Sequence, residues 1–140
     1  MKATEFFQRL GAPLNNPRWS WGAVNSQGAV FLRTWTEQTK EIRGSRYYLI
    51  VDRARYEQSP TSNGFRERLQ HVELVRNGAP CYLVMAEPIK LDARPRRIKA
   101  FDEKSLVVGG TILDEGSKVW IEATGVASVA AVRQSTRRTF

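Results

Sequence analysis

The residues of this chain best suited to chemistry are tryptophans and arginines that lie close together near its start. Trp19, Trp21 and Trp35 are three of the four tryptophans, and Arg18 and Arg33 lie beside them. An indole ring stacks on nucleobases, and a guanidinium group binds a phosphate through two parallel hydrogen bonds. These residue types at this spacing therefore favour a pocket for a flat base that belongs to a nucleic acid. The alternative is that the tryptophans fill the core of a sheet, because aromatic residues also dominate core packing.

Two predicted strands carry these residues. Residues 18–24 and 29–35 alternate as β-strands do, and the turn-forming residues 25–28 between them predict a hairpin. Alternation places the two tryptophans of the first run on one face, and Arg33 and Trp35 on one face of the second run. The paired strands would then present an aromatic surface with arginines beside it.

Positive charge dominates the chain. It has 22 Lys and Arg residues against 14 Asp and Glu, which gives a net charge of +8. Such an excess favours an acidic partner, with nucleic acid first and an anionic membrane surface second. For any one cluster of basic residues, an ordinary solvated surface is the alternative. The candidate nucleic-acid-binding residues are Arg18, Trp19, Ser20, Trp21, Arg33, Trp35, Arg46, Tyr48, Arg66, Arg94, Arg96, Arg97 and Lys99.

Few residues suit catalysis or metal binding. The single cysteine and single histidine exclude an intrachain disulfide and a zinc site made of several Cys and His ligands. Cys81 lies in an apolar run and is expected to be buried. We expect no cofactor, no metal and no catalysis by the isolated chain, with a metal-dependent nuclease as the enzymatic alternative. The carboxylates open to that alternative are Asp52, Glu87, Asp102 and Glu122.

The pattern of the whole chain predicts an α+β fold. We expect a strongly bent, mostly antiparallel sheet or a small barrel with two helices. The predicted helices are 4–11 and 65–77, and the predicted strands are 18–24, 29–35, 45–52, 81–85, 106–113 and 118–123. On the second helix, Arg66 and Arg68 are expected to be outward or flanking. The segments 36–41 and 90–99 are expected to be loops, and Gly109-Gly110 predicts a bulge.

One domain accounts for the length of the chain. We expect residues 1–127 to form it, followed by a basic C-terminal tail, 128–140. No apolar run reaches the ~20 residues that span a membrane, and the N-terminus lacks the apolar centre of a signal peptide. The expected location is therefore the cytoplasm, without a membrane partner.

Several segments together resemble a known family. The segments 18–23, 30–35 and 78–85, with Val108-Gly109-Gly110 and Trp120, resemble small bacterial domains that occur alone or at the N-terminus of HNH-type endonucleases. That resemblance implies a DNA-reading role, in restriction or defence. The chain is also loosely similar to the PUA-like modified-base readers, which implies a bent-sheet domain that holds a flipped base in an aromatic pocket. The zinc ligands of an HNH domain are missing, so cleavage would need a nuclease partner chain.

The first hypothesis is therefore a DNA-binding module that reads a base, modified or not, in an aromatic pocket and contacts phosphates with Arg and Lys. The alternatives are an RNA-binding PUA-like module and a protein-interaction or accessory domain. A preference for ligands with a 2′-hydroxyl would select the RNA alternative.

Overall fold

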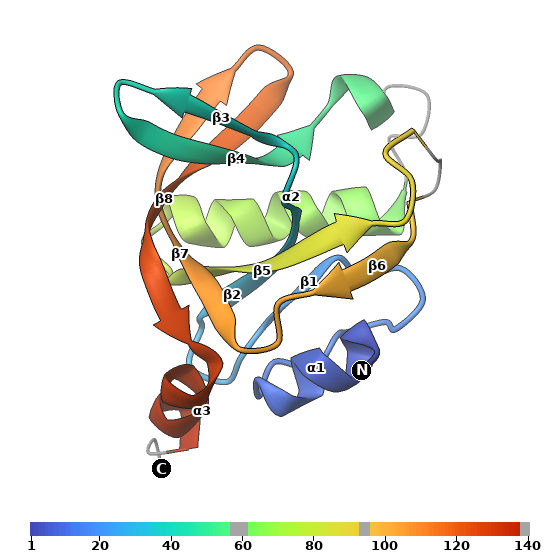
Figure 1. Ribbon diagram of the computed structural model, residues 1–140, viewed down its shortest axis with the longest axis vertical. Coiled ribbons are helices and arrows are strands. Elements are labelled where there is room, and N and C mark those ends of the chain that lie inside the picture. Colours follow the sequence, from blue (N-terminus) through green and yellow to red (C-terminus); the bar gives the residue numbers. More distant parts are fainter. Residues whose placement is uncertain (57–61, 93–95, 138–140) are drawn as a thin grey trace.

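In the computed structural model, the described residues are 1–56, 62–92 and 96–137. They form an α+β fold in which helices cover both faces of one curved sheet (Figure 1). The helices are α1 (Ala3–Arg9), α2 (Asn63–Arg76) and α3 (Val129–Arg137), with a short 3-10 helix η1 (Ala54–Tyr56). The strands are β1 (Gly22–Val24), β2 (Val30–Trp35), β3 (Thr39–Ile42), β4 (Ser45–Asp52), β5 (Cys81–Pro88), β6 (Ile98–Phe101), β7 (Ser105–Glu115) and β8 (Lys118–Ser128).

The sheet is mostly antiparallel, as expected from the sequence. Its strand order is β1-β2-β5-β7-β8-β4-β3, and β6 pairs with β5 beside this path. Only the pairing of β2 with β5 is parallel among the described strands. Because β1 and β3 are edges of this order, the sheet is open and not a closed barrel. The described residues contain eight strands and three α-helices, where the sequence predicts six strands and two helices.

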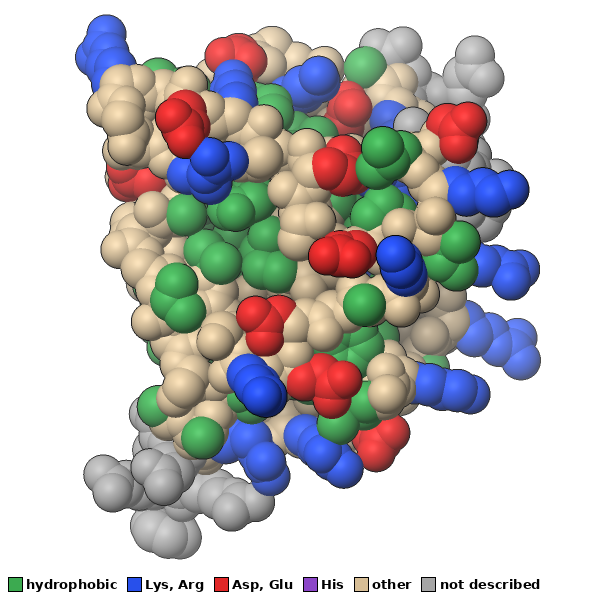
Figure 2. Space-filling view, viewed as in Figure 1, with side chains coloured by type: hydrophobic (Ala, Val, Ile, Leu, Met, Phe, Trp, Pro, Cys, Tyr) green, Lys and Arg blue, Asp and Glu red, His purple; other side chains and the backbone are tan. Residues whose placement is uncertain are grey.

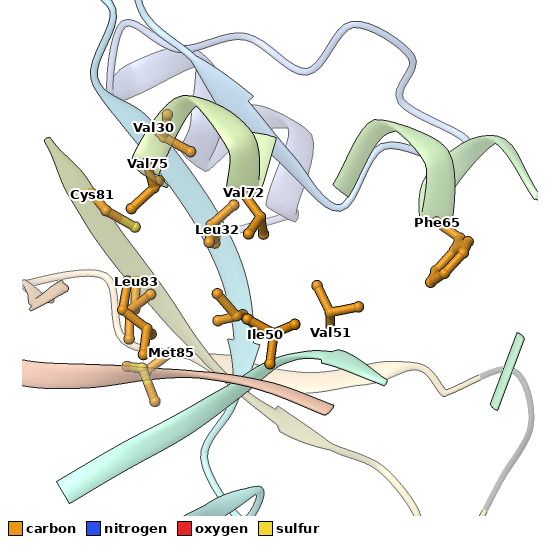
Figure 3. Close-up of a cluster of buried hydrophobic side chains, with 12 residues drawn as sticks. Val30, Leu32, Ile50, Val51, Phe65, Val72, Val75, Cys81, Leu83 and Met85 are labelled. Atoms are coloured by element: carbon orange, nitrogen blue, oxygen red, sulfur yellow. The ribbon is translucent and has the colours of Figure 1, made fainter. Parts of the chain in front are cut away.

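The alternating side chains of β2 pack into two separate hydrophobic cores. Val30 and Leu32 pack on the face that α2 covers, together with Phe65 of that helix (Figure 3). Phe31 points the other way, into a second core with α1 and α3. Apolar residues on both faces fit a strand that is covered on both sides. The β2 strand is thus held firmly, which matters because its end carries part of the candidate site.

The segment predicted as a loop at 36–41 contains a strand. Here β3 pairs with β4 through a tight turn in which Arg43 has φ 51° and Gly44 has φ 82°. Positive φ at both central residues is the geometry of the two-residue hairpin turn. The prediction of a loop rested on the polar composition of this segment. It is wrong because an edge strand exposes one side to solvent and therefore also carries charged residues.

A helix replaces the start of the predicted basic tail. Val129 and Val132 lie one turn apart on α3 and are buried in the second core with α1. The hydroxyl of Ser128 accepts a hydrogen bond from the backbone N–H of Ala131 at 3.0 Å, which caps the helix start. The segment after β8 therefore packs onto the same body. Residues 138–140 of the predicted tail lie outside the described residues.

The predicted loop 90–99 is wrong at its end, because β6 begins at Ile98, and β8 runs to Ser128, beyond the predicted end at residue 123. Other features agree with the sequence prediction. The strand pairing of β7 with β8 shifts register on both sides of Gly109, which confirms the bulge. Cys81 is buried, and burial raises the pKa of its thiol to about 12. Among the described residues, no helix has the length and apolar character needed to cross a membrane.

Candidate nucleic-acid pocket

A pocket of about 320 Å³ lies where α1, the loop before β1, the end of β2 and the start of β6 meet. Ligand pockets commonly measure roughly 300–1,000 Å³, so this volume suits a small ligand or one base. We call it the outer pocket. Its lining residues are Ala3, Thr4, Phe7, Leu14, Pro17, Arg18, Trp19, Ser20, Trp21, Arg33, Trp35, Arg55, Arg96 and Ile98.

The loop at residues 15–21 forms one wall, where the sequence predicts a strand from residue 18. Asn16 explains the difference, because it ends the extended chain with a turn. Its backbone carbonyl accepts from the N–H of Ser20 at 2.9 Å, and its side-chain oxygen accepts from the N–H of Arg18 at 2.9 Å. Asn and Asp side chains form such turns by bonding the backbone two residues on. The strand begins only at Gly22, so Trp19 and Trp21 lie in a loop.

Arginine side chains lie over the rings of two of the three tryptophans, Trp21 and Trp35. The guanidinium carbon of Arg33 lies 4.9 Å from the ring centre of Trp35 and 5.9 Å from that of Trp21. The guanidinium of Arg96 adds a second cation at 5.4 Å from Trp35. Such contacts stabilise by about 0.5–2 kcal/mol each. Trp21 also lies against Gly64, where a Cβ atom would come within 2.5 Å of the indole.

Trp19 is placed differently from these two rings. It lines the outer pocket and is half-buried. Within the described part of the chain, no aromatic ring or cation stacks on its indole. Its position in the loop is fixed through the backbone, where its N–H donates to Asn16. Trp19 is therefore the indole of this pocket best placed to stack on a ligand.

Arg68 of α2 contacts several walls of the pocket and is buried, whereas the sequence predicts an outward or flanking position. It is only 4% exposed and lies 6.0 Å from the ring centre of Trp21. Its guanidinium donates to three backbone carbonyls: Trp21 at 2.9 Å, Arg33 at 2.7 Å and Ile50 at 3.1 Å. These carbonyls belong to the loop, to β2 and to β4. One buried side chain thus fixes three segments around the site.

Two further polar side chains of α2 are buried nearby. Glu67 accepts hydrogen bonds from Asn15 at 3.1 Å and from Ser20 at 3.3 Å, so it anchors the loop to the helix. His71 is 5% exposed, and burial lowers its pKa, while the nearby Glu67 carboxylate acts in the opposite direction. The helix face toward the pocket is therefore polar but closed off from solvent.

The charge of the outer pocket is positive. Of the described residues that line it, four are arginines and none is acidic. One of the four, Arg96, forms an ion pair with Glu37 and donates to the carbonyl of Leu91 at 2.8 Å. A neighbouring groove shares Ala3 and Ile98 with the outer pocket and adds the basic residues Lys2 and Lys99.

Basic side chains continue along the surface from this groove. Figure 2 shows Lys and Arg projecting along the right-hand edge, on the side where Figure 1 places β6. The exposed basic residues in and before β6 include Lys90, Arg97 and Lys99. An anionic chain that leaves the pocket would meet positive charge here.

The structure brings most of the predicted site residues together. Seven of the predicted residues line the outer pocket, and Arg97 and Lys99 flank its lining residue Ile98. Arg94 lies outside the described residues. The residues that line the outer pocket are Arg18, Trp19, Ser20, Trp21, Arg33, Trp35 and Arg96.

Three predicted residues lie elsewhere. Arg46 pairs with Glu41 at 2.6 Å on the β3–β4 hairpin. Tyr48 packs against the first core, and Arg66 is exposed on α2 without lining the pocket. Conversely, sequence reasoning did not identify Arg55 as a pocket residue.

The carboxylates considered for metal binding do not gather. Among the described residues, no three His, Cys, Asp or Glu side chains come close enough to hold a metal ion. Asp52, Glu87 and Glu122 lie on the separate strands β4, β5 and β8, and Asp102 follows β6.

Comparisons with protein-family models, with curated proteins and with solved structures give no match. The resemblance to the domains of HNH-type endonucleases and the PUA-like assignment therefore stay predictions. The function has to be inferred from the pocket itself.

Proposed function

We propose that the protein binds nucleic acid, with DNA as the first candidate, and holds one extruded base in the outer pocket. The observation that carries this proposal is the combination of Trp19, free of stacked ring or cation partners among the described residues, with four lining arginines and no lining carboxylate. The indole takes the base, and Arg18, the lining arginine that is exposed, takes a phosphate.

The magnitudes are compatible with this mode of binding. Extruding a base from a duplex costs a few kcal/mol, and stacking on one aromatic ring returns about 1–3 kcal/mol. Phosphate contacts and hydrogen bonds inside the pocket must supply the remainder. Single-stranded or mismatched targets, whose bases are already unstacked, therefore bind more tightly than a perfect duplex.

The finer assignment rests on the resemblance described above. A modified base read in restriction or defence, with a nuclease partner chain, is the form of the proposal that the HNH-associated domains suggest. An RNA ligand would use the same stacking and phosphate contacts, so titration of matched DNA and RNA strands decides between them.

The first experiment tests the stacking residue. Trp19→Ala should lower affinity for a short single-stranded DNA by about 1–3 kcal/mol and leave the unfolding midpoint nearly unchanged. Tyr47→Ala is the matched control, because Tyr47 is also a half-buried aromatic residue but does not line the pocket. Equal loss in both variants, or none in either, would remove Trp19 from the site.

The second experiment tests the phosphate contacts. Each phosphate that the protein neutralises contributes about −0.9 to the slope of log K against log salt on duplex DNA. Arg18→Ala should make that slope shallower by roughly this amount, whereas Arg66→Ala, which removes an exposed arginine outside the pocket, should not. No binding at low salt to plain or modified DNA or RNA would refute the proposed function.

A further inference from the structure

A second, smaller cavity adjoins the outer pocket. This cavity, here called the inner chamber, has a volume of about 60 Å³, well below that of a typical ligand pocket. It shares Trp21, Arg33, Trp35 and Arg55 with the outer pocket, so the two lie side by side. A ligand seated in the outer pocket can therefore extend only part of itself, such as one edge of a ring, into the inner chamber.

Among the described residues that line the inner chamber, Asp52 is the one carboxylate. It is the last residue of β4, and its Oδ1 atom is buried. Its carboxylate makes no hydrogen bond and no ion pair with any described residue, although its strand partner is Lys118. Most buried polar atoms are hydrogen-bonded, so a carboxylate left in this state has capacity for an external donor.

The two cavities differ in the hydrogen-bonding groups that line them. Arginines line both cavities, Arg33 and Arg55 being shared, but among the described lining residues only the inner chamber adds a carboxylate, which can accept a hydrogen bond from an N–H group. A nucleotide fits with its phosphate outside and an N–H group of its base inside. Gln38 also lines the inner chamber, but its amide both donates and accepts and so selects less sharply.

We propose that Asp52 is a specificity-determining residue that accepts a hydrogen bond from the exocyclic amino group of the bound base. The pocket then selects cytosine, adenine or guanine over thymine and uracil. A carboxylate accepts from the amino group of cytosine, but it faces an oxygen acceptor at the same position of thymine. This inference rests on the proposed binding of a base in the outer pocket.

The sharpest test compares two bases of nearly the same shape. 5-Methylcytosine and thymine both carry the 5-methyl group and differ at position 4, where one has an amino group and the other an oxygen. The probes are two single DNA strands whose only base is one of these, flanked by abasic sugar-phosphate units. Tryptophan fluorescence reports binding of each strand to the wild-type protein and to its variants.

We expect the wild-type protein to bind the 5-methylcytosine strand more tightly by roughly 5- to 150-fold, the range of a good base contact. Asp52→Asn can donate as well as accept, so it should remove or reverse this preference. Glu103→Gln, which neutralises an exposed carboxylate outside both cavities, should keep it.

The outcomes separate the two proposals. Equal binding of both strands by the wild-type protein, or an unchanged preference in a folded Asp52→Asn variant, would overturn the role of Asp52 and leave base binding intact. The comparison of wild-type affinities decides the question even if the variant fails to fold. Failure of the wild-type protein to bind any nucleic acid would overturn the proposed function, and the role of Asp52 with it.

Discussion

Replacing Arg68 with methionine should destabilise the fold by about 2–4 kcal/mol, because it leaves the carbonyls of Arg33 and Ile50 without this donor. The guanidinium donates to the carbonyls of Trp21, Arg33 and Ile50 at 2.9, 2.7 and 3.1 Å. Methionine keeps much of the length and apolar contact of the arginine stem but supplies no N–H group. The substitution therefore removes the hydrogen bonds with little change in packed volume.

The magnitude follows from the number of orphaned carbonyls. The carbonyl of Trp21 keeps a hydrogen bond from the backbone N–H of Arg33 at 2.9 Å, so only the carbonyls of Arg33 and Ile50 are counted as losing their donor. Each buried acceptor left unsatisfied costs about 1–3 kcal/mol, so these two set a range of roughly 2–6 kcal/mol. The inner chamber lies beside Arg68, so water can reach some of these carbonyls and reduce the loss. The lower half of the range is thus expected. Domains of this kind unfold with about 5–15 kcal/mol, so the loss is a large share of the total.

Urea unfolding measures the effect, with Arg66→Met as the matched control. Arg66 lies two residues earlier on the same helix and is exposed, so its replacement should change stability by no more than about 0.5 kcal/mol. Arg68→Lys should fall between the two, because an ammonium group cannot reach three carbonyls with the planar fork of arginine. If Arg68→Met unfolds at the same urea concentration as Arg66→Met, the proposed tie between the three segments is wrong.

Three other substitutions test the surroundings of the pocket. Trp120→Ala should cost about 3–5 kcal/mol of stability, since the ring is 8% exposed, but it should leave DNA affinity unchanged because Trp120 does not line the pocket. A folded Trp120→Ala variant with weakened binding would contradict this. Gly64→Ala should weaken binding, because its Cβ would lie 2.5 Å from the Trp21 indole and must displace it; unchanged affinity would show that the position of this ring does not matter. Burial lowers the pKa of His71 below its ordinary 6.5, so the unfolded chain takes up the proton first. Stability is then complete above pH 6.5 and falls as the pH drops below it, and His71→Leu should flatten this dependence in urea unfolding between about pH 7 and 5. An identical pH dependence in both proteins would show that another group is responsible.

Much of the sheet could be predicted because its strands are covered on both faces. The alternating and apolar runs of β2, β4 and β5 are long enough to indicate strands, and the Asn25–Gly28 turn is confirmed by the antiparallel pairing of β1 with β2. Prediction from the alternation of residues failed where a short-range hydrogen bond determined the path of the backbone instead. Trp19-Ser20-Trp21 alternates like a strand, but hydrogen bonds to Asn16 turn the chain there instead.

The pocket itself could be predicted only in part. The tryptophans and Arg33 are close in sequence, so their proximity was accessible to local reasoning. Arg55 and Arg96 reach the same pocket from distant segments, and no sequence pattern in a single chain places them there. Arg68 follows Phe65 by three residues and precedes Val72 by four, so it lies on the buried face of α2. Its charge favoured an outward or flanking position, and the three backbone carbonyls that accept hydrogen bonds from it explain why the buried charge is tolerated.

The tryptophans show why burial alone does not separate a core residue from a pocket residue. Trp35 and Trp120 are both 8% exposed, yet Trp35 lines the outer pocket and Trp120 does not. What distinguishes the rings is the groups that contact them. Arg33 and Arg96 lie over Trp35, and Lys40 lies 4.3 Å from the ring centre of Trp120. Trp19 has no such partner among the described residues, so stacking on it displaces no protein contact. Arg33 and Arg96 already fix the pocket walls near Trp19, so binding a base costs little additional conformational entropy. A base that enters therefore meets one open indole in a rigid frame, which is why a single substitution at Trp19 is the most direct test of function.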